Sequence, residues 1–562
     1  MSRTWRPRLL VAALAWLALA GTPSQAAPTD TPPSQAELRE SAWEAAQWSF
    51  RSGAGAALVQ MSARFARKDD ALGRLERQRA TLSGRLGALD RSILQTVTRT
   101  DEQSAAELDR LRQERARVAE ALRAISAIIE RDFPAYAELA RPRVVPSRQL
   151  QALLSEDEGL LLIVSDETSS YLFAVTHDRF EWRRSPRTGL ARIDAAVARL
   201  RAGLQPPRAT GVQVPFDTGL ANELFRELVQ PADALLASKS TLIVVTSGSL
   251  ASLPFGVLVT DPDAARSGSA TAGWLIDRQA LAALPSVSSL FALRCLRRDG
   301  GKPAPGCPDL GRDEPVAARS SSGLLAIGAP ELGPPRDASR GAGPSAVFAG
   351  SALADGALLR QFGSLPGAER ELLDLKTHFP GARIVERGAA TETYVRRSGD
   401  VRNARYLVLA THGLLAGQAG PLSEPGLVFT PPPQERRSAE DDGYLSASEA
   451  AGLTLSADVV ALSACNTAAA DGFSSGDEWL SGLARGFFYA GARSLLVSHW
   501  EVNDAATASI MLGTFRRLEA SGGAGRAAAL RDAIRSLRAD TANPYWTRPY
   551  YWAAFSLVGD PA

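Results

Sequence analysis

The chain has 562 residues and a mass of 59.6 kDa, which predicts several structural units at roughly 100 to 200 residues per domain. Its composition, 45% hydrophobic and 22% charged, excludes the fibrous and wholly disordered classes. Lys and Arg total 63 against 61 for Asp and Glu, and the formal net charge of +2 gives no overall attraction to nucleic acid or to anionic membranes.

The N-terminus has the parts of a secretory signal peptide. Three arginines precede an apolar run over 9–20, and small residues at 24–26 offer a cleavage site. The run is well short of the ~20 apolar residues that span a bilayer, so an uncleaved membrane anchor is the weaker alternative. We predict a signal peptide over 1–26, with cleavage after Ala26. The exported protein is then periplasmic or extracellular and does not span the membrane.

Export affects how the three cysteines are interpreted, because an oxidising compartment pairs exposed thiols. Cys295 and Cys307 flank a polar, turn-rich stretch, where a disulfide would close a short surface loop. Two free surface thiols are the alternative. Cys465 is then the unpaired thiol. The histidines and cysteines show no Cys-x-x-Cys or His-Glu-x-x-His spacing, so we expect no metal site and no cofactor.

A helical region precedes the rest of the fold. Residues 27–35 are rich in Pro, Thr, Ser and Ala and predict a mobile leader, and a helical pattern covers 36–141. Two apolar stripes, separated by a polar break at 98–104, predict an antiparallel helical hairpin of coiled-coil type. The stripes consist of Leu75, Leu82, Leu86, Leu89 and Ile93, and of Leu108, Leu111, Val118, Leu122, Ile125 and Ile129. They pack on each other within the chain or, alternatively, form an oligomer seam.

The pattern then changes to short apolar runs that alternate with amphipathic helices. The runs lie at 159–164, 171–175, 242–245, 324–327, 406–410, 459–462, 494–497 and 554–558. The helices are expected at about 189–203, 218–235, 365–378, 476–490, 504–519 and 524–538. Continuous apolar runs are typical of strands buried on both faces. The pattern predicts an α/β fold with a mainly parallel sheet flanked by helices.

A histidine and a cysteine each follow the end of a predicted strand. His412 comes just after the run over 406–410, and Cys465 just after the run over 459–462. Reactive groups gather at the carboxyl ends of strands in open α/β sheets, so we expect the two side chains to lie together. An imidazole that takes the thiol proton makes a nucleophile, so the pair is a candidate Cys/His dyad. Taken singly, each residue is more typically structural.

The spacing agrees with a known arrangement. His412 precedes Cys465 by 465 − 412 = 53 positions, close to the spacing of caspases. The surrounding motifs, Ala410-Thr-His-Gly413 and Leu462-Ser-Ala-Cys-Asn-Thr467, resemble the two catalytic motifs of the CHAT domain, a caspase-like peptidase module often found beside tetratricopeptide repeats. Further matching blocks lie at 253–256, 365–369, 484–491, 498–504 and 549–555.

The resemblance implies a CHAT domain over 142–562, with an N-terminal pseudo-caspase half over 142–322 and a catalytic half over 323–562. It implies Cys465 as the nucleophile, His412 as general base and then acid, and backbone amides near Gly413 and Cys465 as an oxyanion hole. The protein would then be an exported cysteine endopeptidase with a protein or peptide substrate.

The substrate pocket is less well defined by sequence. Relatives specific for Arg or Lys often carry Asp where this chain has Ser463, so basic specificity gains no support there. Asp471, Asp477 and Glu478 could line a negative pocket instead, or be solvated loop acids.

An interaction module is the alternative function. Ala468 stands where the family commonly has Gly, and an oxidising destination is unusual for a thiol enzyme. A catalytically weak or inactive CHAT-like protein that binds a peptide or a regulatory partner protein would fit these departures. No cluster of aromatic and basic residues indicates nucleic acid.

Overall fold

The structure is a computed structural model. It describes residues 34–48, 50, parts of 74–89, 102–132, 144–205, 214–263, 273–295, 307, 322–334, 347, 353–414, 425–438, 440–463, parts of 483–500, and 503–562. The predicted signal peptide and most of the predicted leader lie outside these residues.

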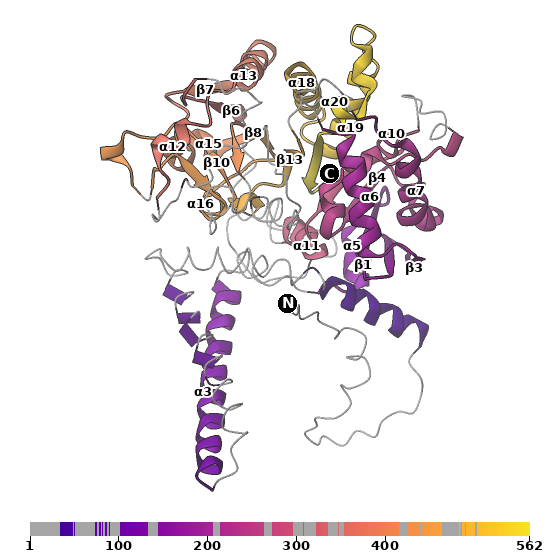
Figure 1. The fold of residues 1–562 in the computed structure, drawn as a ribbon, viewed down its shortest axis with the longest axis vertical. Helices are drawn as coiled ribbons and strands as arrows, with labels where there is room; N and C mark the ends of the chain where they lie inside the picture. The colour runs from indigo at the N-terminus through magenta and orange to yellow at the C-terminus, as the bar shows by residue number, and fades with distance from the viewer. Residues whose placement is uncertain are drawn as a thin grey trace, which may run out of the picture.

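One large sheet organises the fold, as Figure 1 shows. Its 11 strands run in the order β3-β2-β1-β4-β5-β14-β13-β12-β8-β6-β7. The first part of the chain supplies β1 (Glu158–Ser165), β2 (Ser169–Thr176), β3 (Phe180–Pro186), β4 (Thr241–Val245) and β5 (Ala280–Leu284). The second part supplies β6 (Ser322–Pro330), β7 (Arg383–Arg387), β8 (Ala404–Ala410), β12 (Val459–Leu462), β13 (Ser494–Ser498) and β14 (Phe555–Gly559). The predicted α/β class is confirmed.

Nine of the 11 strands form two parallel blocks that run in opposite directions, and β2 and β3 continue the sheet beside β1 as antiparallel strands. β1, β4, β5 and β14 are parallel neighbours, and so are β13, β12, β8, β6 and β7. The blocks meet at β13 and β14, which pair antiparallel from Ser494 with Gly559 to Ser498 with Phe555. The strands of the two blocks therefore end on opposite sides of the sheet, so that the carboxyl ends of one block lie level with the amino ends of the other.

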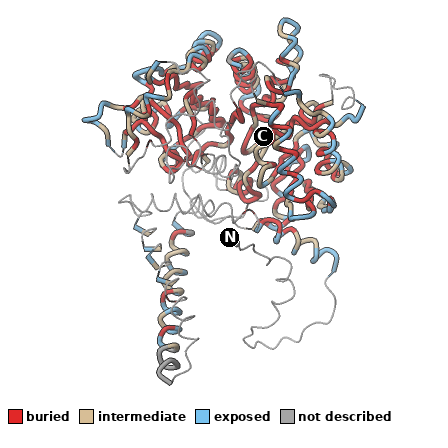
Figure 2. Tube along the Cα trace, viewed as in Figure 1, coloured by how far each residue is buried: buried red, intermediate tan, exposed pale blue. Residues whose placement is uncertain are grey.

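Both faces of the sheet are buried, which explains the continuous apolar runs. Alternate residues of a strand enter different cores: Val459 and Ala461 face one core, and Val460 and Leu462 face the other. Figure 2 shows this buried centre in both blocks, with exposed residues on the outer helices.

Helices cover each face. One face carries α6 (Leu190–Ala202), α7 (Thr218–Leu228), α8 (Asp233–Leu236), α10 (Leu275–Arg278), α13 (Pro366–His378), α18 (Asp504–Ala520), α19 (Arg526–Arg538) and α20 (Pro549–Trp552). The opposite face carries α5 (Ser147–Leu153), α11 (Val287–Cys295), α14 (Glu392–Arg397), α15 (Gly399–Asn403) and α16 (Ala447–Ala451). The predicted helix over 476–490 lies mostly outside the described residues.

A small second sheet follows β8. It is formed by β9 (Gly413–Leu414), β10 (Gly426–Val428) and β11 (Tyr444–Ser446), in the order β11-β10-β9. Both pairings are antiparallel. The short helix α12 (Gly356–Arg360) contributes Leu359 to the apolar cluster beside this sheet, together with Leu414 and Val428.

The helical hairpin projects from the sheet in Figure 1. Its second arm is α3 (Glu102–Asp132), and helical residues at 74–89 belong to the first. Leu89 packs with Leu111 and Val118 in one apolar cluster, and Arg85 pairs with Glu114 across the arms. The two stripes thus contact each other within the chain.

The helix before the hairpin packs on the large sheet, although the sequence grouped its residues with the hairpin. Residues 35–48 are helical, and Trp43 and Phe50 pack into the core of the first block. The Trp43 indole Nε1 donates to the Val145 carbonyl at 2.8 Å. This helix therefore belongs to the sheet core, although the sequence placed it in the hairpin region.

Two further findings concern linkage and membrane topology. Cys295, at the end of α11, and Cys307 are joined by a disulfide. Within the described part of the chain, no helix is both long and apolar enough to cross a bilayer.

Candidate functional site

His412 lies just past the carboxyl end of β8, where the main chain turns into the small sheet. The Val428 amide donates to the His412 carbonyl at 2.9 Å, and Gly413 pairs with Leu427. The Thr411 hydroxyl donates to the Val428 carbonyl. Strand β10 therefore fixes the backbone on both sides of the histidine.

The imidazole of His412 is oriented by a carbonyl of the main chain. Its Nε2 lies 3.0 Å from the Gly363 oxygen, and Phe362 contacts the ring with centroids 5.7 Å apart. Because a carbonyl only accepts, Nε2 carries the proton and Nδ1 of the neutral ring is left as an acceptor. Burial lowers the pKa of His412, although the bond to Gly363 acts in the opposite direction. The ring is thus neutral at pH 7, with Nδ1 as its acceptor atom.

Gly363 was not identified by the sequence analysis. It has φ = 79°, in the left-handed region that glycine adopts at little cost. It follows α12, 49 positions before His412. The only trace of this role in the sequence is that residue 363 is a glycine. Nothing in the sequence links this glycine to His412.

The strand that leads to Cys465 lies beside the strand that leads to His412. β8 and β12 are parallel neighbours, with Tyr406 opposite Val459 and Leu409 opposite Leu462. Arg405 and Asp458, 53 positions apart, form an ion pair of 2.9 Å at the start of the two strands. The register of the strands is therefore the same 53-residue offset that separates His412 from Cys465 in the sequence.

A buried carboxylate adjoins the end of β12. Ser463, the residue after β12, donates from Oγ to Glu371 Oε2 at 2.5 Å. Glu371 belongs to α13 and is 4% exposed. Glu371 was not among the residues predicted from the sequence, although it lies close after the matching block at 365–369. The contact ties the end of β12 to a helix and places a carboxylate beside Ser463, the last described residue after that strand.

Several predicted site residues lie outside the described residues. These are Cys465 and the candidate pocket acids Asp471, Asp477 and Glu478, all within 464–482. Of the predicted site, the structure places His412, Gly413, Cys295 and Cys307.

The other strand-end histidine is buried in the structure. His499 follows β13, and its Nε2 lies 2.9 Å from the Ser556 hydroxyl. Trp500 beside it is buried, and its Nε1 donates to the Tyr550 carbonyl at 3.1 Å. In the part of the chain that the structure describes, no group of three or more His, Cys, Asp or Glu could hold a metal ion.

A family model matches the greater part of the chain. The CHAT domain model matches residues 218–560, which is more than half of the chain. The chain therefore belongs to the CHAT domain family. Strands β1 to β3 precede the matched range, yet β1 pairs with β4 inside it and so extends the same sheet.

The comparison with solved structures found matches at low identity. Two crystal structures of the Saccharomyces cerevisiae separase–securin complex match with 10% and 9% identity and TM-scores of 0.38 and 0.39. Each match covers 83% of this chain and 35% or 34% of the matched chain. This chain thus spans about a third of that length. The search of curated protein sequences found no match.

Proposed function

We propose that the protein is an exported cysteine endopeptidase of the CHAT type, with Cys465 as nucleophile and His412 as its base. The supporting observation is the geometry of the two strand ends. β8 and β12 are neighbours with a 53-residue offset, and the imidazole after β8 is held with Nδ1 free of the Gly363 contact. The proposal places the thiol, which lies outside the described residues, opposite this ring.

The chemistry of such a pair is acyl transfer. His412 takes the proton of the Cys465 thiol, and the thiolate attacks the carbonyl carbon of a peptide bond. Protonated His412 then returns the proton to the leaving amine, and water hydrolyses the thioester to release the acid and the free thiol. Amides near Gly413 and Cys465 would stabilise the oxyanion.

An exported destination is part of the proposal. It is supported by the signal-peptide pattern over 1–26 and by the disulfide between Cys295 and Cys307, a bond that persists in oxidising compartments. A thiol enzyme in such a compartment must keep its nucleophile reduced, so we expect activity to require mild reductant.

The test is cleavage of a mixed-sequence peptide library by the protein in mild reductant. The variants Cys465→Ala and His412→Ala test the dyad, and His378→Ala, which changes an exposed histidine on α13, is the matched control. We expect cleavage by the wild type and by His378→Ala, and none by the two dyad variants. Cleavage that survives in Cys465→Ala would refute the proposed nucleophile.

The residue preference in the same library tests the pocket. A preference for basic residues that disappears on replacing Asp471, Asp477 or Glu478 would assign that acid to the substrate pocket. An unchanged preference in all three variants would leave them as solvated loop acids.

The projecting hairpin supports a second candidate, a CHAT-like interaction module. Its arms are packed on each other, so α3 and its partner form a pre-ordered surface away from the sheet. The two candidates differ in the thiol. A reactive-thiol label should modify Cys465 quickly in an enzyme and much more slowly in the His412→Ala variant. Equal labelling of both proteins, with no library cleavage, would favour the interaction module.

A further inference from the structure

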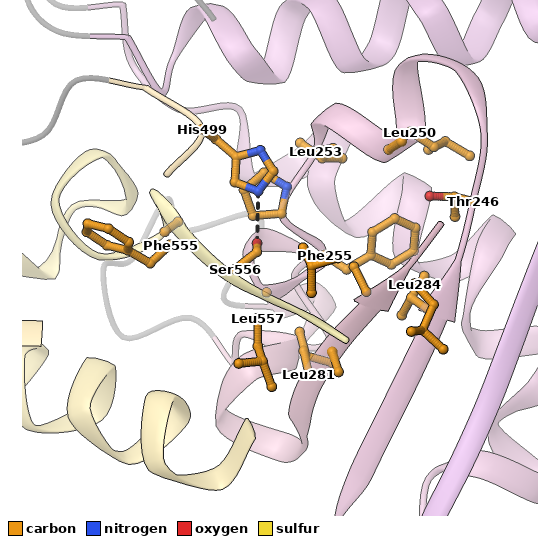
Figure 3. A pocket seen from close by; sticks show the side chains of 18 of the residues that line it. Thr246, Leu250, Leu253, Phe255, Leu281, Leu284, His499, Phe555, Ser556 and Leu557 are labelled. Atoms are coloured by element: carbon orange, nitrogen blue, oxygen red, sulfur yellow. Dashed lines mark hydrogen bonds between the residues drawn. The ribbon is translucent and has the colours of Figure 1, made fainter. Parts of the chain in front are cut away.

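The first block is only partly closed between β5 and β14, next to the strand at which the two blocks meet. β5 and β14 pair at a single position, Val558 with Ala283, whereas β4 and β5 pair continuously from Thr241–Ala280 to Val245–Leu284. A cavity of about 150 Å³ lies at this gap, and Figure 3 shows side chains that line it. It is separate from His412, which does not line it.

The cavity is lined mainly by apolar side chains. They come from β5 and β14, from the short helical turns after β4 and from α19, and they include Leu250, Phe255, Leu281, Leu284, Phe555 and Leu557. Among the described residues that line it, none is Asp, Glu, Lys or Arg. A cavity of about this size lined by Leu, Ile and Phe stays dry and accepts small apolar molecules. The body of a fitting ligand is therefore apolar and about the size of one ring or a short alkyl chain.

One end of the cavity can form hydrogen bonds. His499 and Ser556 both line it and face each other at 2.9 Å. Burial, reinforced by the charge of Arg201, lowers the pKa of His499 to about 3. The imidazole is therefore neutral at physiological pH, and this end offers hydrogen bonding without a charge of its own.

A buried cation lies behind this end. Arg201 of α6 is 7% exposed and donates to the carbonyl of Ser252, whose neighbours Ala251 and Leu253 both line the cavity. Burial alone lowers the pKa of Arg201, and no carboxylate among the described residues forms an ion pair with it. A buried charge without a counter-charge is costly, so an anion nearby would stabilise this corner.

We propose that the cavity binds a small monocarboxylate with an apolar body of about six to eight carbons. Its body lies between β5 and β14, and its carboxylate lies at the end formed by His499 and Ser556, within the field of Arg201. This site is additional to the proposed peptidase centre, and binding there requires no peptidase activity.

The first test uses the unmodified full chain and three probes that share one alkyl body: octanoate, octanol and octylamine. Isothermal titration should show saturable binding of one octanoate per chain, with octylamine at least about tenfold weaker, a difference of about 1.4 kcal/mol. Octanol should be intermediate. Octylamine that binds as tightly as octanoate, or octanoate without saturable heat, overturns the proposal.

Variants locate the site. Ala251→Phe places a ring in the cavity from its wall and should abolish octanoate binding, whereas Ala237→Phe, at an exposed position after α8, should leave it unchanged. Arg201→Gln should remove the preference for octanoate over octanol. Undiminished binding in Ala251→Phe overturns the assignment to this cavity. If Ala251→Phe does not fold, as judged by circular dichroism, the ranking of the three probes on the wild type still decides the proposal.

Discussion

A buried charge network joins the first and last parts of the sheet, and its central residue is Arg294 of α11. The guanidinium contacts Glu158 of β1 at 2.6 and 2.8 Å and Asp560, just after β14, at 2.7 Å. Exposed fractions of the three side chains are only 12%, 5% and 13%. Arg294→Met keeps an apolar stem of similar length but leaves both carboxylates buried without this partner.

The expected cost follows from that burial. Removing one member of a buried ion pair destabilises a protein by about 3–5 kcal/mol, because the remaining charge stays out of water. Arg526 still contacts Asp560 at 3.1 Å and offsets part of the loss there, whereas the structure shows no such second ion pair for Glu158 among the described residues. We therefore expect Arg294→Met to lower the free energy of unfolding by about 3 kcal/mol at pH 7.

The loss should depend on pH. Burial tends to raise the pKa of Asp560, but the charges of Arg294 and Arg526 outweigh it and hold that pKa below its ordinary value. A carboxyl with a lowered folded-state pKa contributes stability above its unfolded pKa, roughly 3.9 for Asp, and loses it as the pH falls through the folded value. The difference between wild type and variant should thus shrink below about pH 4.

The assay is urea unfolding followed by tryptophan fluorescence at several pH values. Arg183→Met, which removes an exposed pair with Glu181 on the edge strand β3, is the control and should cost less than about 1 kcal/mol. Arg294→Met combined with Glu158→Gln should recover part of the loss. A loss for Arg294→Met no larger than the control's would refute the reasoning.

Three further predictions concern the site, the disulfide and the hairpin. Gly363→Ala strains a backbone at φ = 79° and shifts the carbonyl that orients His412. The kcat of peptide cleavage should therefore fall at least about tenfold, with KM little changed. An unchanged kcat would contradict this role of Gly363. Replacing Cys295 and Cys307 with Ala should cost about 3 kcal/mol of unfolding free energy by urea titration, and mild reductant should then no longer affect stability. Reductant sensitivity that persists in this variant contradicts the assignment. Val118→Asp puts a charge at a position 5% exposed between the hairpin arms, and should increase proteolytic cleavage within 74–132 while leaving the sheet's unfolding midpoint unchanged. Protection equal to that of the wild type would contradict the packing of the arms.

The strands that the sequence predicted share one physical property, burial on both faces. Continuous runs such as the one over 459–462 are therefore recognisable without their partners. In the large sheet, the two edge strands that were missed lack that property, whereas β9, β10 and β11 of the small sheet are buried but only two or three residues long. β3 and β7 lie at the two edges of the sheet and carry exposed arginines, so their apolar residues are few. β5 is central but consists of alanine and leucine, and alanine has low strand propensity.

The candidate site was predictable where it depends on strand register and unpredictable where it depends on distant contacts. His412 and Cys465 were predicted as a pair because each follows an apolar run. The structure shows that the two strands are parallel neighbours, while Cys465 itself lies outside the described residues. Gly363 contacts His412 from 49 positions away in the sequence, and Glu371 contacts Ser463 from 92 positions away. Neither contact leaves a local pattern, because a backbone carbonyl has no residue identity and a buried glutamate in a helix resembles a surface one.

The opposite directions of the two blocks decide where chemistry of the Cys/His type can occur. The turns directly after β4 and β5 begin with Thr246 and Pro285. Because the two blocks run in opposite directions, these turns and His412 lie at opposite ends of the strands. A nucleophile and a base at opposite ends of the strands could not meet. The first block can therefore support the sheet, but neither residue of the proposed dyad can come from the turns after its strands. This separation leaves the gap between β5 and β14, inside the first block, free for another role. The cavity lies in that gap, and β13, which pairs with β14, is also the neighbour of β12. A molecule bound in the cavity would therefore contact β14, which lies two strands from β12, the strand that leads to Cys465.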